Sequence, residues 1–320
     1  MKGQLLKVKT LLLFIVNILL NPVVYAQKLN VDNVTSERLA EKFIHRIDKD
    51  YESFKIRKIA SFTNYHRETK KSCKYIADSL GITESFYKAD FDRNGLTDLL
   101  VTGEFGDFAV LVALNQGKNS FKIKQLTRRS FQDCVFPKIL NDSVIRYYYL
   151  SENYGLDKEE AGLLFKDLIL KFNDFVEFNP SPKKHDIEKI EYQTSMCYGI
   201  CPKFYIKINK NRAAIFKAEK YNVENWKSKP SKSISGTFSG EIDEKSFSDI
   251  VSLLDYIDFP NLKDSYSVNW TDDQTCTLKV TYNNGTVKEI KDYGLVGTSG
   301  LNRLYQLFFE LRFNQKWNED

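Results

Sequence analysis

Hydrophobic residues in the first part of the chain recur at a helical period. From Ser36 to Phe54 they fall every three or four positions, which is typical of one buried helix face, and Ser36 is suited to cap that helix. The same spacing predicts a second helix from Lys58 to Leu80, which Gly81 would end. The pattern therefore predicts two helices before the first strand.

From Phe86 to Phe178 the pattern changes to alternating or short apolar runs, separated by turns rich in Gly, Asn and Asp. Such runs predict β-strands, and the short connections between them favour antiparallel neighbours. The predicted strands are 86–89, 97–104, 108–115, 121–127, 134–140, 144–150 and 163–176.

Residues 180–186 contain two prolines two positions apart, which neither a helix nor a β-ladder can continue, so this segment is predicted to be a linker. Beyond it, alternating strands, a helix capped by Asp243 and a last helix beginning near Ser299 are expected. The predicted fold class is α+β with two domains, 27–179 and 187–320, each an antiparallel sheet with packed helices.

Residues 1–26 have the features of a secretory signal peptide. Three lysines precede an apolar run over 11–20, and Ala26 is suited to cleavage before Gln27. The run is too short to span a bilayer comfortably, and no later stretch is apolar enough to do so. The protein is therefore expected to be exported, as a periplasmic or secreted protein without a membrane span after cleavage.

Composition and charge narrow the range of partners. The 320 residues are 42% hydrophobic and 28% charged, which is ordinary globular material for about two domains. Cleavage removes three lysines and no acid, so the formal net charge falls from +5 to +2. No nucleic-acid partner is expected at that charge, and a protein or cell surface is the candidate partner.

The segment 90–98 carries the clearest chemistry in the sequence. Oxygen-bearing groups fall at positions 1, 3, 5, 7 and 9 of a loop with Gly95 at position 6, a spacing that suits a hard cation, most plausibly Ca²⁺. The predicted ligands are Asp90, Asp92, Asn94, Leu96 through its carbonyl, and Asp98. The alternative is a polar Asn-Gly turn that happens to be acidic.

The flanks of this loop read as strands, and Val101 stands where an EF-hand would have its bidentate glutamate. The pattern D-F-D-x-N-G-x-x-D resembles the calcium loop of FG-GAP or VCBS-type repeats. That resemblance implies that Asp90, Asp92, Asn94 and Asp98 are side-chain ligands. Only one copy is present, so no propeller is predicted.

Five cysteines in an exported chain predict disulfides. Cys197 and Cys201 are four residues apart and can be joined across a turn, and Cys73 and Cys134 are the remaining pair in the first domain. Cys276 is then expected to stay free on an inward strand face. Connectivity is not fixed by the count alone.

The second domain resembles the bacterial domain-of-unknown-function family 6438 over residues 187–317. Its opening, C-[FY]-G-x-C-P-x-[FY], is matched by Cys197, Tyr198, Gly199, Cys201, Pro202 and Phe204. The family continues with a D-x-Y segment, a Thr-Asp turn and a late Trp, and the matches here are Asp264 with Tyr266, Thr271 with Asp272, Asp292 with Tyr293, and Trp317. The extra cysteine, Cys276, is a departure. The resemblance implies a shared fold and an exported context, and no activity.

No nucleophile, base and orienting group stand at a telling spacing, so an enzyme is not the favoured prediction. We expect an exported, non-catalytic binding or structural protein, with Ca²⁺ and disulfides as braces and an unknown ligand. One alternative is an extracytoplasmic hydrolase using Asp264, Asp272 and Asp292. Another is a thiol-redox protein using Cys197 and Cys201, although redox pairs usually stand two residues apart at a helix start.

Overall fold

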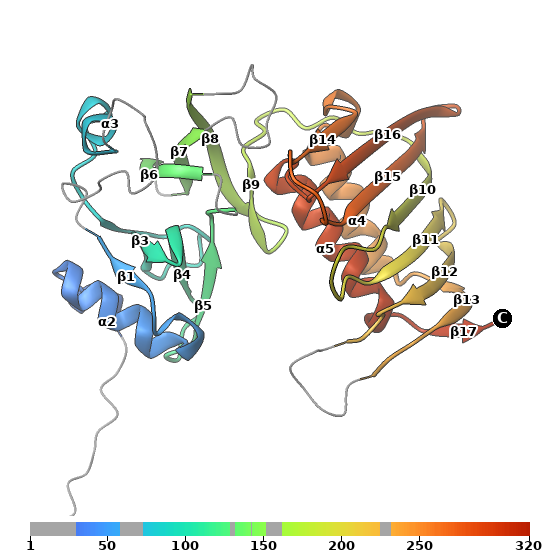
Figure 1. The fold of residues 1–320 in the computed structure, drawn as a ribbon, viewed down its shortest axis with the longest axis horizontal. Coiled ribbons are helices and arrows are strands. Elements are labelled where there is room, and N and C mark those ends of the chain that lie inside the picture. The colour runs from blue at the N-terminus through green and yellow to red at the C-terminus, as the bar shows by residue number, and fades with distance from the viewer. Residues whose placement is uncertain (1–29, 58–72, 129–131, 142, 152–161, 225–231) are drawn as a thin grey trace, which may run out of the picture. The chain divides into compact units, whose positions relative to one another are not determined.

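The computed structural model describes residues 30–57, 73–128, 132–141, 143–151, 162–224 and 232–320. The predicted signal peptide, 1–26, and the first part of the second predicted helix, 58–72, lie outside these residues. The described part is mostly β-sheet, arranged in three sheets with four α-helices (Figure 1). No described helix is both long enough and apolar enough to cross a membrane.

The strands of the N-terminal half form two antiparallel sheets, where the sequence had predicted one. The five-stranded sheet contains β1 (Lys55–Ile56), β2 (Phe86–Ala89), β3 (Asp98–Phe105), β4 (Asp107–Asn115) and β5 (Phe121–Gln125). The four-stranded sheet contains β6 (Gln132–Asn141), β7 (Val144–Ser151), β8 (Gly162–Lys171) and β9 (Asp174–Glu177).

The reason for the division is the core that the two sheets share. One cluster joins apolar side chains of β3 and β4 to those of β6 to β9, among them Leu100, Val110, Val112, Val135, Ile145, Tyr147, Leu168 and Phe175. Strand β4 is buried along almost its whole length, as expected of a strand covered on both faces. Pairing β5 with β6 in one sheet would have left these apolar faces without a partner.

The predicted single strand 163–176 is also two strands. Phe172 and Asn173 both adopt positive φ, at 55° and 62°, which is the conformation of a two-residue hairpin turn. Strands β8 and β9 pair on either side of it, with Lys171 opposite Asp174. Asn173 tolerates this conformation readily, whereas the aromatic Phe172 gave no turn signal.

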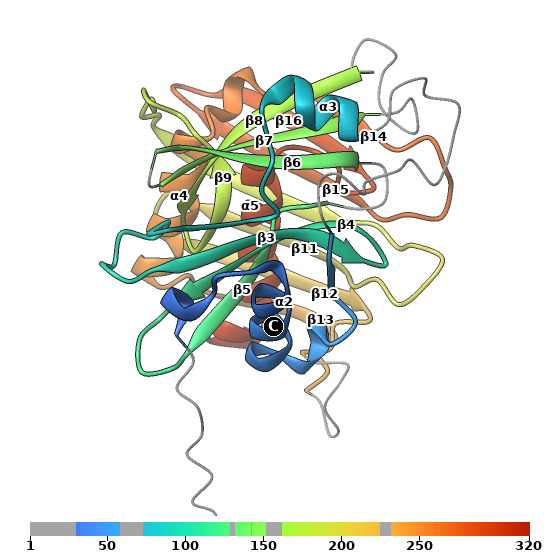
Figure 2. The same cartoon turned by 90° about the vertical axis from the view of Figure 1, so that its left-hand side faces the viewer.

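Two short helices flank these sheets (Figure 2). Helix α2 (Glu37–Ile47) begins as predicted at Ser36, whose side chain accepts a hydrogen bond from the Leu39 N–H. It lies beside β1. Helix α3 (Cys73–Leu80) packs against β6, and Gly81 follows it with a φ of 66°. A left-handed glycine at that position is a common end for a helix.

The C-terminal half is built on an eight-stranded sheet in the order β14-β16-β15-β10-β11-β12-β13-β17. Its strands are β10 (Ile187–Thr194), β11 (Lys203–Asn209), β12 (Ala213–Lys220), β13 (Gly236–Glu241), β14 (Ser265–Ser267), β15 (Thr275–Tyr282), β16 (Thr286–Tyr293) and β17 (Trp317–Glu319). The pairing is antiparallel except between β14 and β16, which run parallel and so correct the prediction of a purely antiparallel sheet. Both strands run opposite to β15, which lies between them in the chain.

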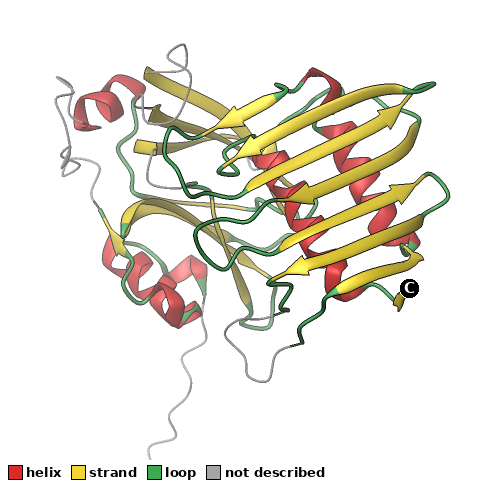
Figure 3. Ribbon diagram, turned by 45° about the vertical axis from the view of Figure 1, so that its right-hand side comes forward, coloured by secondary structure: helices red, strands yellow, loops and turns green. Residues whose placement is uncertain are grey.

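Helices α4 (Glu244–Tyr256) and α5 (Ser299–Asn314) cross one face of this sheet (Figure 3). Asp243 caps α4 as predicted, whereas α5 is capped by Thr298, one residue before the predicted Ser299. The core beneath them combines aliphatic and aromatic side chains, and the rings of Tyr192 and Phe308 stack with centroids 4.5 Å apart.

Strand β17 pairs with β13 at one edge of the eight-stranded sheet. A Cβ at Gly240 would lie 2.7 Å from the Lys316 carbonyl oxygen, so only glycine allows this approach. The predicted linker, 180–186, contacts the C-terminal half: His185 donates its backbone N–H to Asp255, and its ring lies against Phe259. The predicted domain boundary there stays a prediction.

Candidate functional site

The loop between β2 and β3 brings three of the five predicted ligands together. One carboxylate oxygen from each of Asp90, Asp92 and Asp98 lies within 4.8 Å of the others. Two oxygens bound to one Ca²⁺ at about 2.4 Å are separated by no more than about 5 Å, so this spacing fits a single ion. Gly95 provides the bend with a φ of 80°, and Arg93 also adopts a positive φ.

Backbone N–H groups hold these carboxylates in place. Asp90 accepts hydrogen bonds from Asn94 and Gly95 at 3.0 and 2.8 Å. Asp98 is fully buried and accepts from Phe91 at 2.8 Å and from Asn115 at 2.7 Å, so it ties the loop to the end of β4. Each oxygen keeps a lone pair for another partner.

Burial and mutual repulsion raise the pKa values of carboxylates in this loop. Burial raises the pKa of Asp98 to about 6, against the two backbone donors, and the charges of Asp92 and Asp90 raise it further. Burial also raises the pKa of Asp92. A cation would relieve this repulsion, as would protonation of one acid.

Asn94 presents its amide nitrogen, not its oxygen, to the carboxylate of Asp92. Its Oδ1 accepts from the Leu96 N–H at 2.8 Å, while its Nδ2 donates to Asp92 and to the Asn115 carbonyl. Ligation through Oδ1 would require the amide to turn over. The arrangement seen is an Asx-type turn, the local alternative to ion binding that an asparagine offers.

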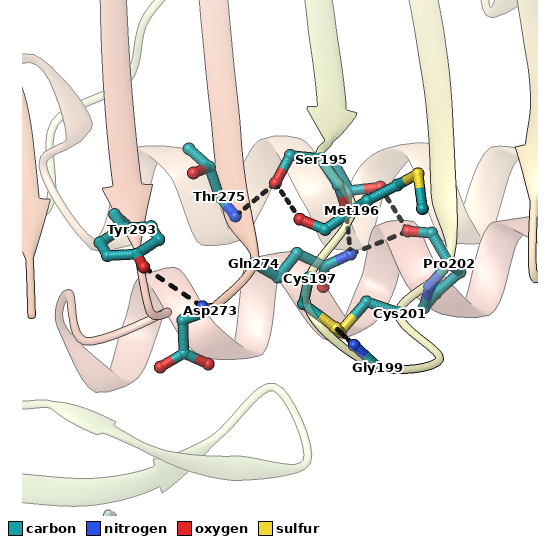
Figure 4. Close-up of a disulfide and its surroundings, with 11 residues drawn as sticks. Ser195, Met196, Cys197, Gly199, Cys201, Pro202, Asp273, Gln274, Thr275 and Tyr293 are labelled. Atoms are coloured by element: carbon teal, nitrogen blue, oxygen red, sulfur yellow. Dashed lines mark hydrogen bonds between the residues drawn. A yellow bond between two sulfur atoms is a disulfide. The ribbon is translucent and has the colours of Figure 1, made fainter. Parts of the chain in front are cut away.

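The disulfide Cys197–Cys201 closes the turn between β10 and β11 (Figure 4). Its Cα atoms are 5.6 Å apart, and Gly199 donates its N–H to the Cys197 sulfur. Gln274 fastens the turn to the neighbouring strand, because its Nε2 donates to the carbonyls of Ser195 and Pro202. A strand follows Pro202, so the pair does not stand at the start of its own helix, where the helix dipole would stabilise a thiolate.

The second disulfide, Cys73–Cys134, joins the start of α3 to β6, with Cα atoms 5.1 Å apart. Both residues are fully buried in a small apolar cluster with Ile76 and Phe136. Cys134 adopts a φ of 47° at an irregularity in the β6 ladder. The bond therefore joins this short helix covalently to the strand that it packs against.

Cys276 is buried and is not part of a disulfide. The Tyr192 hydroxyl donates to its sulfur at 2.9 Å, and burial raises the pKa of the thiol to about 12. A thiol in this state is neither a nucleophile nor a metal ligand at neutral pH.

The three aspartates of the hydrolase alternative have different surroundings. Asp264 pairs with Lys288 and is largely exposed, and Asp272 lies exposed in a turn. Asp292 is fully buried, where it accepts from the N–H groups of Val296 and Gly297. Burial raises the pKa of Asp292, but its bonds assign it to holding the loop before α5.

A polar group that the sequence did not reveal lies at the N-terminus of α5. Glu177 at the end of β9 accepts from the Ser299 N–H at 2.7 Å and from the Gly300 N–H at 2.9 Å. Lys166 lies 3.9 Å from Glu177 and donates to the Ser299 hydroxyl at 2.8 Å. Burial works to raise the pKa of Glu177, but Lys166 and the two backbone donors outweigh it and hold that pKa below its ordinary value.

Arg128, which follows β5, contacts the loop that leads into α5. Its guanidinium donates to the carbonyls of Gly297 and Leu295, 169 and 167 residues away. No motif or periodicity points to either contact, and only the general expectation that buried charges are paired could have suggested them.

The comparisons with known proteins concern only the C-terminal half. No curated protein and no solved structure matches the chain at a significant level. Residues 188–312, less than half of the chain, match the family model described as Domain of unknown function (DUF6438). This match supports the resemblance inferred from the sequence, and the matched segment runs from β10 into α5.

Proposed function

We propose that this protein is an exported, non-catalytic binding protein whose fold is braced by one Ca²⁺ and two disulfides. The observation that carries the calcium part is the convergence of Asp90, Asp92 and Asp98 within 4.8 Å at a turn between two strands. An ion there would fix the turn and the register of β3 against β2 and β4. With three carboxylates and no bidentate glutamate, the affinity is expected to resemble that of extracellular modules, on the order of 10⁻⁴ M.

The non-catalytic part rests on how the reactive side chains are used. Cys276 is a buried neutral thiol, Cys197 and Cys201 are bonded to each other, and Asp292 is engaged by backbone donors. Export would supply the oxidising environment in which both disulfides form. Sequencing the N-terminus of the mature protein tests the export part of the proposal, with Gln27 expected as the first residue.

Thermal unfolding in the presence of Ca²⁺ tests the ion. Protein freed of metal with a chelator and then given 5 mM Ca²⁺ should gain about 2 kcal/mol of stability if the dissociation constant is about 10⁻⁴ M. The melting temperature should rise accordingly. Equal melting temperatures with and without the ion would refute the calcium brace.

A matched pair of variants locates the effect. Asp92→Asn removes one ligand charge while leaving the backbone bonds of Asp90 and Asp98 intact. Asp107→Asn changes an exposed acid at the start of β4, outside the loop. The first variant should lose the response to Ca²⁺ and the second should keep it.

A further inference from the structure

A cavity of about 840 Å³ lies along α5, on the side of the helix that faces β5, β8 and β9. Asn302, Gln306, Phe309 and Phe313 line it from the helix, and their spacing of three and four residues places them on one helix face. Phe175 of β9 lines the opposite wall. The volume falls within the range of small-molecule sites, about 300–1,000 Å³.

Arg312 contributes a buried positive charge to this lining. Only 7% of the residue is exposed, and its guanidinium lies 4.9–5.0 Å from the ring centroids of Phe204, Phe309 and Phe313. Its hydrogen bonds go to neutral acceptors, the Asn222 side chain and the Phe309 carbonyl. Within the described residues it forms no ion pair with a carboxylate.

Burial lowers the pKa of Arg312 to about 10, with only the hydroxyl of Tyr192 acting against it. A buried guanidinium without a counter-ion carries an uncompensated cost of desolvation. Aromatic rings recover part of this cost, and a charge-assisted bond to an anion would recover more.

Two of the three acids of the lining are paired with basic side chains, and the third, Glu224, has no ion pair among the described residues. Asp174 pairs with Lys124 at 3.4 Å, and Glu310 pairs with Arg303 at 2.9 Å. The cavity thus combines two paired acids, a third acid, aromatic walls and the Arg312 guanidinium, which forms no ion pair among the residues that the structure describes. Its chemistry suits an anion with an apolar body.

We infer that this cavity binds a small organic acid with an aromatic or apolar body, whose acidic group pairs with Arg312 while its body packs on Phe175, Phe309 and Phe313. This inference rests on the proposed binding function and gives it a ligand class. It does not depend on the calcium loop, which lies outside the cavity lining.

Fluorescence titration with two matched probes tests it. 8-Anilinonaphthalene-1-sulfonate is an aromatic anion, and N-phenyl-1-naphthylamine is a neutral analogue of it. With the full mature protein in chelator, we expect saturable binding of one equivalent of the anion. Chelator keeps the outcome separate from that of the calcium test.

Arg312→Gln should weaken binding of the anion at least tenfold and change binding of the neutral probe less than threefold. Arg212→Gln is the matched control, because Arg212 pairs with Glu241 and neither residue lines the cavity. It should leave both affinities unchanged. Equal loss of both probes in the Arg312 variant would refute the role of the charge.

A second variant keeps the test decisive if Arg312→Gln does not fold. Gln306 is exposed on α5, and Arg303, which donates to its Oε1, also pairs with Glu310. Gln306→Trp can therefore fill the cavity while Arg303 keeps its ion pair. Binding of both probes should then fall at least tenfold in a variant that still unfolds cooperatively. Binding of the anion that survives this substitution would overturn the inference.

Discussion

Replacing Glu177 by glutamine should destabilise the protein, because Glu177 links β9 to the N-terminus of α5 through two hydrogen bonds. Its two carboxylate oxygens accept from the first two N–H groups of the helix. Glutamine can accept through one oxygen only, and its amide nitrogen would point a second donor at a backbone N–H. One helix N–H would therefore lose its partner, and the helix terminus would lose a neutralising charge.

The magnitude follows from these losses. A buried N–H left without an acceptor costs about 1–3 kcal/mol, and loss of a negative charge at a helix N-terminus costs about 0.3–1 kcal/mol. Lys166, whose side chain is 15% exposed, would also lose its anion. The Glu177 side chain keeps 34% of its surface exposed, so water would recover part of the loss and a net cost of about 2 kcal/mol is expected.

Urea denaturation followed by tryptophan fluorescence measures this cost. With a slope of about 3 kcal/mol per molar urea for a chain of this size, the midpoint should fall by about 0.7 M. Asp249→Asn is the control, since it removes an exposed ion pair with Lys245 on α4 and should cost less than about 0.5 kcal/mol. If the two variants shift the midpoint equally, the link between β9 and α5 is not the stabilising contact described above.

Two further predictions concern a helix cap and the disulfides. Asp243→Ala should cost about 1 kcal/mol by removing the cap of α4. Backbone and side-chain bonds from Ser246 lower the pKa of Asp243 from 3.8 to about 2, so the cap contributes fully above about pH 4 and its contribution is lost as the pH falls from 4 to 2. The gap in melting temperature between wild type and variant should therefore narrow over that window, and a gap independent of pH would contradict the capping role. Replacing both Cys73 and Cys134, 61 residues apart, by alanine should lower the free energy of unfolding by about 4 kcal/mol, because the lost bond closes a long loop. The same change at Cys197 and Cys201, four residues apart, should lower it by about 2 kcal/mol. Calorimetry that gives the reverse order would contradict this chain-entropy estimate.

Local features were well predicted from the sequence because neighbouring residues determine them. The caps at Ser36 and Asp243 satisfy helix N–H groups three residues away, and Asn284-Gly285 lies in the turn between β15 and β16. The acidic loop was predicted from spacing alone, and three carboxylates do converge there. The Oδ1 of Asn94 accepts from the Leu96 N–H, and ligation by Asn94 stays a prediction.

Contacts between distant segments were not predictable in the same way. Glu177 meets Ser299 across 122 residues, and Arg128 meets Gly297 across 169. Neither residue breaks the local pattern of its own segment, so nothing in the sequence distinguishes it from a surface charge. The division of the first half into two sheets was missed for a related reason, since alternation of apolar residues predicts a strand but does not name its neighbour.

Strand β17 has a practical consequence for work on the C-terminal half. The family match ends at residue 312, before Trp317 begins the strand that covers β13 (Figure 1). A recombinant fragment cut at the matched limits would leave β13 as an uncovered edge strand. Its free backbone N–H and C=O groups could then pair with a strand of another molecule, which is a common route to aggregation. Fragments for crystallisation should therefore extend through Asp320, and affinity tags are better placed ahead of residue 187.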